Sequence, residues 1–176
     1  MNKLVALTFA LALTFVTACS SIPTKDIEIQ TEAAPKANFS GYTSYTWLGA
    51  ATLIADAAGQ WEAPDFDADS EVKFLIDREL RARGMSQDST NPDVVVAFAL
   101  GVNMDALELK TDPDSDLDVM TNVPKGGLVM FMIDADTGLV IWAGVAGAEV
   151  TPGLDAKTAK GRLDYAVTEM LSELPK

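Results

Sequence analysis

The chain of 176 residues carries 26 acidic and 13 basic side chains, no histidine and one cysteine. Its formal net charge of −13 repels nucleic acid and anionic lipid head groups, so we expect no nucleic-acid partner. Without histidine and with a single thiol, the chain cannot build a Cys/His zinc site or use the commonest general base, so we expect no cofactor and no enzymatic activity.

Residues 1–19 have the features of a lipoprotein signal. Lys3 precedes an apolar run over residues 4–15, which is shorter than the roughly 20 residues needed to span a bilayer. Residues 16–19, VTAC, place a branched residue and two small ones before Cys19. This motif resembles the bacterial lipobox, which implies diacylation of the Cys19 thiol, cleavage before Cys19 and acylation of the new amine. The alternatives are an ordinary signal peptide with an incidental cysteine, or a buried N-terminal helix.

These features predict a signal peptide over residues 1–18, a lipidated tether over 19–25 and a single domain over 26–176. Lys3 is the only charged residue of the signal peptide, so the remaining 158 residues carry a net charge of −14. Membrane attachment is therefore expected to come from lipid and not from basic patches. Ser20 follows the cysteine, and in Gram-negative lipoproteins a serine there implies delivery to the outer membrane, on its periplasmic side.

The first half of the domain predicts two strands and a helix. Residues 26–31 and 43–48 alternate apolar and polar side chains, as half-exposed strands do. Residues 49–68 are expected to be irregular and contain Trp61, which either covers the core or is an exposed binding contact. A helix is expected over 67–83, with Asp67 as N-cap and Gly84 as its stop.

The second half predicts three strands and a closing helix. Residues 93–104 alternate large and small side chains, 127–134 are apolar on both faces, and 139–150 follow a turn in which Gly138 suits a positive φ. An acidic loop is expected over 105–123 and an amphipathic helix over 155–173. This order favours an α+β fold, with an antiparallel sheet of about five strands (β-β-α-β-β-β-α) and both helices packed on it.

Several segments together are similar to one family of bacterial lipoproteins. They are residues 38–47 (NFSGYTSYTW), the Arg83–Gly84 helix exit before 93–98 (DVVVAF), 136–144 (DTGLVIWAG), and the closing helix up to Pro175. With the lipobox, they resemble the domain-of-unknown-function 4136 (DUF4136) family over about residues 26–175. The resemblance implies an extracytoplasmic α+β lipoprotein and transfers no activity and no catalytic residue. Ala143, in place of an expected basic residue, and the longer segments 49–68 and 105–123 depart from the family pattern.

The acidic loop is the first candidate site. Calcium takes six to eight oxygen ligands, which alternate aspartates in a short loop are able to supply. The full EF-hand pattern is not met, and a solvated loop is the alternative that we favour. Helix N-terminal charge explains Asp65, Asp67 and Asp69, and we interpret Glu149 and Asp164 as surface groups and not as a catalytic pair. The candidate ligands are Asp112, Asp114, Asp116 and Asp118.

One face of the strand over 127–134 is the second candidate site. Leu128, Met130 and Met132 share that face, and methionine adapts to irregular apolar partners. Together with Trp61, these side chains are candidates for a groove that holds lipid or a partner protein. The alternative is that a helix or the 49–68 segment simply covers them.

The sequence therefore predicts a lipid-anchored outer-membrane protein of unknown molecular activity. We expect a non-enzymatic interaction or structural module with an envelope protein as partner. The alternative is a protein that binds calcium or an apolar ligand. A third hypothesis, an enzyme such as a glycan hydrolase, requires two facing carboxylates about 5–9.5 Å apart in a cleft.

Overall fold

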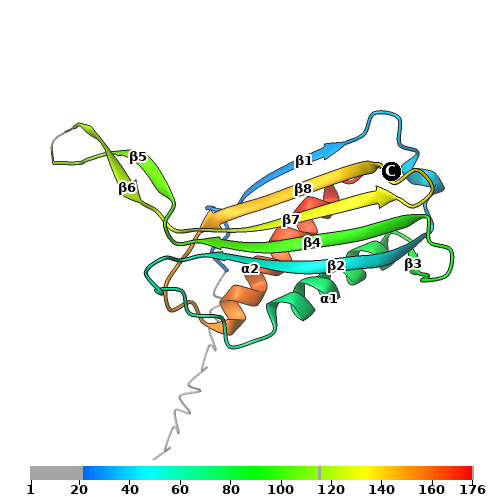
Figure 1. Cartoon of the computed structure of the whole chain (residues 1–176), viewed down its shortest axis with the longest axis horizontal. Helices are drawn as coiled ribbons and strands as arrows, with labels where there is room; N and C mark the ends of the chain where they lie inside the picture. The colour runs from blue at the N-terminus through cyan, green and yellow to red at the C-terminus, as the bar shows by residue number, and fades with distance from the viewer. Residues whose placement is uncertain (1–21, 115, 176) are drawn as a thin grey trace, which may run out of the picture.

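A mixed sheet of six strands organises the computed structural model, which describes residues 22–114 and 116–175 (Figure 1). The strands lie in the order β1-β8-β7-β4-β2-β3, and both helices cover the same face of the sheet (Figure 1). The α+β class is therefore confirmed. The elements of this main body are β1 (Glu28–Ala33), the 3-10 turn η1 (Phe39–Gly41), β2 (Ser44–Ala55), α1 (Ala68–Ala82), β3 (Ser86–Gln87), β4 (Val94–Asn103), β7 (Lys125–Asp134), β8 (Val140–Glu149) and α2 (Ala156–Ser172).

Two parallel strand pairs correct the expectation of an all-antiparallel sheet of about five strands. β2 is parallel to both β4 and β3, whereas β4–β7, β7–β8 and β8–β1 are antiparallel. The reason is α1, which follows β2 and returns the chain to the end of the sheet where β2 begins, so the next long strand runs in the same direction. The sixth strand, β3, has two residues, too few to show a pattern in the sequence.

β2 extends well beyond the predicted strand over 43–48. It has 12 residues and ends at Ala55. Residues 49–51 are Gly and Ala, which have weak strand propensity, so the sequence indicates a loop there. Pairing with β4 holds them as strand through Ala55, with a β-bulge between Trp47 and Gly49.

Residues 105–123 form a hairpin and not the expected loop. β5 (Leu107–Thr111) pairs antiparallel with β6 (Asp118–Asn122) in a sheet of two strands. The β5–β6 arm, as we call residues 107–122, projects past the end of the main sheet (Figure 1). Apolar and polar residues do alternate along both strands, but the many aspartates of the segment favoured a loop.

Both helices begin and end where their caps predict. The Asp67 and Asp155 side chains accept hydrogen bonds from the Ser70 and Thr158 amides, at 3.0 and 2.9 Å. After α1 the chain turns at Gly84, whose φ of 86° places it in the left-handed region that favours glycine. The described residues include no helix that is both long and apolar enough to cross a bilayer.

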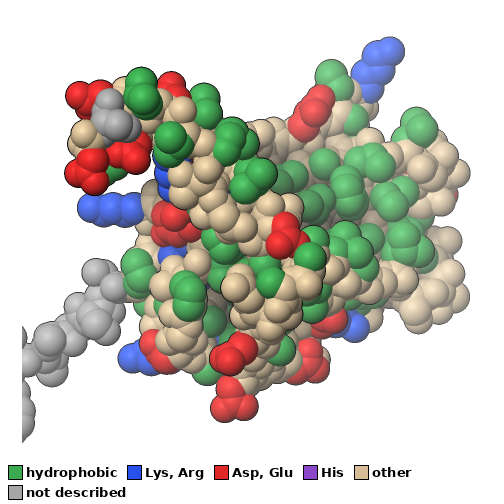
Figure 2. Space-filling view, turned by 60° about the vertical axis from the view of Figure 1, so that its left-hand side comes forward, with side chains coloured by type: hydrophobic (Ala, Val, Ile, Leu, Met, Phe, Trp, Pro, Cys, Tyr) green, Lys and Arg blue, Asp and Glu red, His purple; other side chains and the backbone are tan. Residues whose placement is uncertain are grey.

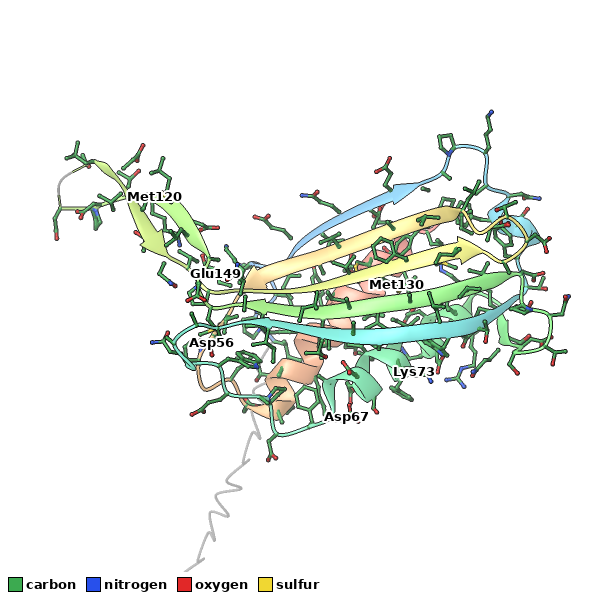
Figure 3. All side chains as sticks on the ribbon, viewed as in Figure 1. Asp56, Asp67, Lys73, Met120, Met130 and Glu149 are labelled. Carbon is green, nitrogen blue, oxygen red and sulfur yellow. The ribbon has the colours of Figure 1, made fainter. Side chains whose placement is uncertain are left out.

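The core lies between the sheet and the two helices. Val94 and Val96 of β4, together with Met130 of β7, contribute fully buried side chains to it, and Met130 is labelled in Figure 3. α1 is fixed to β2 by Asp77, which accepts hydrogen bonds from the Tyr45 hydroxyl (2.7 Å) and the Trp47 indole (3.1 Å). Because strand side chains alternate in direction, the residues between these buried ones point to the opposite, helix-free face.

Candidate functional site

The chain begins its ordered path against α2. Cys19 and Ser20 lie outside the described residues, and Ile22 is the first residue described. A Cβ on Gly161 would collide with the Ile22 side chain, so the missing side chain of Gly161 makes room for Ile22. Arg162 donates to the Pro23 carbonyl and makes two bonds to the Asp26 carboxylate, at 2.9 and 2.6 Å. We call these contacts of Ile22, Pro23 and Asp26 with α2 the N-terminal junction.

The N-terminal junction shortens the expected tether of residues 19–25. Its described part, from Ile22 onward, is attached to α2, so only Ser20 and Ser21 separate Cys19 from the domain. The hydrogen bond from Arg162 holds the pKa of the Asp26 carboxyl below its ordinary value, as a paired carboxylate on a guanidinium should. The sequence signal for this contact is Gly161, a residue with a poor helix propensity in the middle of a helix.

The four candidate calcium ligands lie at the tip of the β5–β6 arm. The Asp114 amide donates to the Asp112 carboxylate (2.8 Å), and the Thr111 hydroxyl donates to that of Asp118 (2.9 Å). Asp116 adopts a φ of 55°, which a turn requires. No three acidic or cysteine side chains of the described ranges come together as a metal-binding group. The geometry shows that two of these aspartates stabilise the turn and gives no support for a calcium site.

The β5–β6 arm turns its ion pairs toward the main sheet. Glu108 pairs with Lys125 of β7 at 2.7 Å, and Lys110 pairs with Glu149 of β8 at 3.0 Å. Glu149, labelled at the base of the arm in Figure 3, is thus part of an ion pair. The opposite face of the arm carries Leu107, Leu109 and Met120, each at least 60% exposed.

The expected apolar groove on β7 is corrected by the structure. Leu128, Met130 and Met132 are buried in the core beneath α1 and α2, so they are not available to a ligand or partner. The alternative, that a helix covers this face, is the one observed. Trp61 is half-buried in the loop after β2, where its backbone amide donates to Asp56 at 2.6 Å, and it does not belong to that core.

The described carboxylates do not form a catalytic pair across a cleft. Asp164 pairs with Arg78 (2.5 Å), whereas Glu149 pairs with lysines at the other end of the sheet, so these two serve different contacts. A surface hollow between β1 and α2 contains two carboxylates, Glu169 and Glu173. Both come from one face of α2, one turn apart, so they line the same wall of the hollow and do not face each other.

The sequence analysis missed the helix-free face of the sheet as a functional surface. It contains the side chains and glycines that alternate with the buried residues: Val95, Ala97, Ala99 and Gly101 of β4, Gly127, Val129, Phe131 and Ile133 of β7, Ala143, Val145 and Gly147 of β8, and Gly49, Ala51 and Leu53 of β2. We call this set the open face. An antiparallel sheet with one solvated face normally carries polar residues there, but these are all apolar or glycine. Figure 2 shows hydrophobic side chains gathered over the sheet.

Comparison with protein families gives one match over most of the chain. The sequence model of the family described as "Domain of unknown function (DUF4136)" matches residues 29–176. The matched segment includes every strand and helix of the main body except the first residue of β1. No functionally curated protein matches the chain.

Solved structures share the fold at low sequence identity. A DUF4136 family protein from Bacteroides thetaiotaomicron superposes with a TM-score of 0.50 at 11% identity, covering 82% of this chain and 95% of that chain. A PDZ domain protein from Parabacteroides distasonis gives a TM-score of 0.50 at 11% identity, covering 84% of this chain but 36% of that chain. A PelC dodecamer from Paraburkholderia phytofirmans gives 0.46 at 19% identity, covering 83% and 95%.

Proposed function

The chain belongs to the DUF4136 family, and we propose that it is a lipid-anchored lipoprotein on the periplasmic side of the outer membrane. Within the envelope it acts as a non-enzymatic module that contacts other proteins. The family is described only as a domain of unknown function, so the proposal rests on the residues of this chain.

The N-terminal junction is the observation that carries the anchoring proposal. Ile22, Pro23 and Asp26 are attached to α2, and two residues separate Ile22 from Cys19. Three residue steps extend at most about 11 Å. Acyl chains on Cys19 would therefore hold the N-terminal end of α2 beside the head groups, with little freedom for the domain to move away.

Two features support a role without catalysis. The chain has no histidine, so acid–base work would fall to carboxylates. Those best placed by the fold are engaged in structural contacts: Asp93 accepts four hydrogen bonds from Thr43 and Ser44, and Asp134 accepts from Tyr42 and Thr137. These contacts hold the pKa of both carboxyls below the ordinary value, which keeps them ionised and unable to act as general acids at neutral pH.

Fractionation of Gram-negative cells tests the anchor. We expect the full-length chain to be found in the outer-membrane fraction, with mass spectrometry showing that it begins at an acylated Cys19. Cys19→Ala should abolish acylation and remove the protein from that fraction. A mature chain that begins elsewhere, or that carries no fatty acid on residue 19, would refute the proposal.

A substitution next to the cysteine provides the matched control. Ser20→Asp retains the lipobox cysteine, so we expect acylation to persist while the protein moves to the inner membrane. If Ser20→Asp leaves the distribution unchanged, the assignment to the outer membrane is wrong although the anchor itself stands. Assays of the purified protein on glycans, with Glu169→Gln as comparison, test the non-enzymatic part: turnover that this substitution abolishes would contradict it.

A further inference from the structure

The open face is apolar across four adjacent strands. Phe131 is 37% exposed and Leu53 is 64% exposed, and none of the described helices or loops covers them (Figure 1). Exposed apolar patches of this kind mark interaction surfaces in soluble domains. The charged residues nearest to the open face are Glu28 and Glu32, which belong to β1 at the outer edge of the sheet.

Large and small side chains are distributed unequally over the open face. In one cross-strand row, Phe131 of β7 stands beside Ala97 of β4, and in the next row Val129 stands beside Ala99. In a third row, the glycines at positions 147, 127 and 101 lie side by side and Leu53 of β2 ends the row. The larger residues of the first two rows thus lie on β7, and the small ones lie on the neighbouring β4.

The glycine at the outer end of the third row is not explained by packing within the chain. A Cβ on Gly147 would meet nothing within 4 Å, and its φ is not in the left-handed region. A glycine inside a strand often marks a place where another group approaches the backbone closely. Something outside the described chain therefore has room to approach at Gly147.

From this pattern we infer that the open face is a docking surface for a second copy of this chain, related by a two-fold axis that runs along the strands between β4 and β7. Such an axis exchanges the two sides of the sheet without changing the position along a strand. Leu53 of one copy then stands over Gly147 of the other. Phe131 stands over Ala97, and Val129 over Ala99. A single rotation places each of these large side chains opposite a small one, which is the self-complementarity that a two-fold interface requires.

The size and charge of the open face suit such a dimer. Strands of 10 residues are about 33 Å long, and four strands at about 4.8 Å spacing are about 19 Å wide, which gives roughly 600 Å² per copy. Two copies bury about 1,200 Å² in total, at the lower end of stable protein interfaces. β1 lies beyond the four central strands, so its glutamates stay at the rim in solvent, where the repulsion between two acidic copies is screened.

The proposal concerns the described domain alone and does not depend on the Cys19 anchor. A pair of substitutions tests it on the full-length chain, with two differently tagged copies expressed together and purified through one tag. Gly147→Leu should reduce recovery of the second copy about tenfold, because the introduced side chain would meet Leu53 of the other copy. Adding Leu53→Ala should restore recovery, since the side chain introduced at position 147 then faces a small residue.

Control variants separate loss of docking from loss of folding. Gly147→Leu should melt at the wild-type temperature or above, because its side chain has free space and improves strand propensity. Phe74→Asp adds a charge at a 57% exposed residue of α1, away from the open face, and should leave recovery unchanged. Failure of the wild-type copies to purify together, or equal recovery with Gly147→Leu, would overturn the proposal. So would failure of Leu53→Ala to restore recovery.

Crosslinking provides a second measurement. One chain carries Leu53→Cys and the other Gly147→Cys, and a bismaleimide with a span of about 10 Å matches the spacing of two packed sheets. We expect a crosslinked pair only when both chains are present, because two copies of residue 53 are about 14 Å apart sideways in this geometry. If phosphatidylethanolamine vesicles protect residues 53 and 147 from maleimide while copies never crosslink, lipid covers the open face and the dimer is overturned.

Discussion

Arg162 illustrates, at the scale of one residue, how a side chain sets the position of a whole domain. Its guanidinium binds the Pro23 carbonyl and the Asp26 carboxylate, and so fixes the chain that leads to Cys19. We predict that Arg162→Ala frees residues 22–27. Amide exchange there should accelerate, and trypsin should cleave after Lys25. Because Asp26 is 40% exposed, the loss of stability should be limited to about 1 kcal/mol.

Arg81→Ala is the matched control for this prediction. Arg81 donates to the Asp77 carbonyl within its own helix, α1, so its removal should leave exchange at residues 22–27 unchanged. Equal exchange in wild type and Arg162→Ala would show that the N-terminal junction is held by the Ile22–Gly161 contact instead.

The β5–β6 arm is the element least connected to the rest of the molecule. Its base is closed by a hydrogen bond from the Val123 amide to the Ala106 carbonyl, 2.8 Å long, which is the bond that closes a two-residue turn. We predict that replacing residues 107–122 by Asn-Gly leaves the main sheet folded. Only exposed ion pairs with Lys125 and Glu149 are lost, so the melting temperature should fall by less than about 5 °C.

Calorimetry of the shortened chain checks this prediction, with the same Asn-Gly in place of residues 135–138 as comparison. That second replacement removes the turn between β7 and β8, where Asp134 binds Thr137 and Tyr42, and should cost more stability. If excision of the β5–β6 arm abolishes cooperative melting, the arm contributes to the fold itself.

For the whole molecule, shifted pKa values predict stability limits at both ends of the pH scale. Hydrogen bonds hold the pKa of Asp93 and Asp134 below the ordinary value, so their contribution is present above about pH 4 and is lost as the pH falls through the folded-state pKa. Burial, with the Asp134 contact second, raises the pKa of Tyr42 to about 12. Its contribution is complete below the unfolded value of about 10 and is lost as the pH rises toward 12.

Melting temperatures between pH 2 and about 12 measure these limits. Tyr42→Phe cannot ionise, so the decline above pH 10 should be shallower in this variant, while the acid limb keeps its position apart from the lost Asp134 contact. Asp93→Asn should instead flatten the acid limb and leave the alkaline limb unchanged. An alkaline limb identical in wild type and Tyr42→Phe would assign that limb to lysine deprotonation.

The sequence predicted correctly those features that depend on neighbouring residues. Asp67 and Asp155 cap helices through bonds to residues three positions on, and Gly138 forms its turn with a φ of 70°. The calcium-ligand pattern in the β5–β6 arm was also local, but it proved to be turn geometry: Asp112 binds the amide of Asp114. A local pattern is reliable for the backbone, whereas ligand binding depends on which groups converge in space.

By itself the sequence determined the strand and helix order, the caps and the alternation along β7, because each of these follows from contacts within a few residues. Only the tertiary structure decided that β2 pairs parallel with β4, that β2 continues to Ala55, and that Met130 is buried while Phe131 is exposed. The physical reason is the two-residue period of a strand: β7 is apolar on both faces, so its sequence is the same whichever face the helices cover. The side taken by α1 and α2 settles that choice, and it leaves the other face free for a partner.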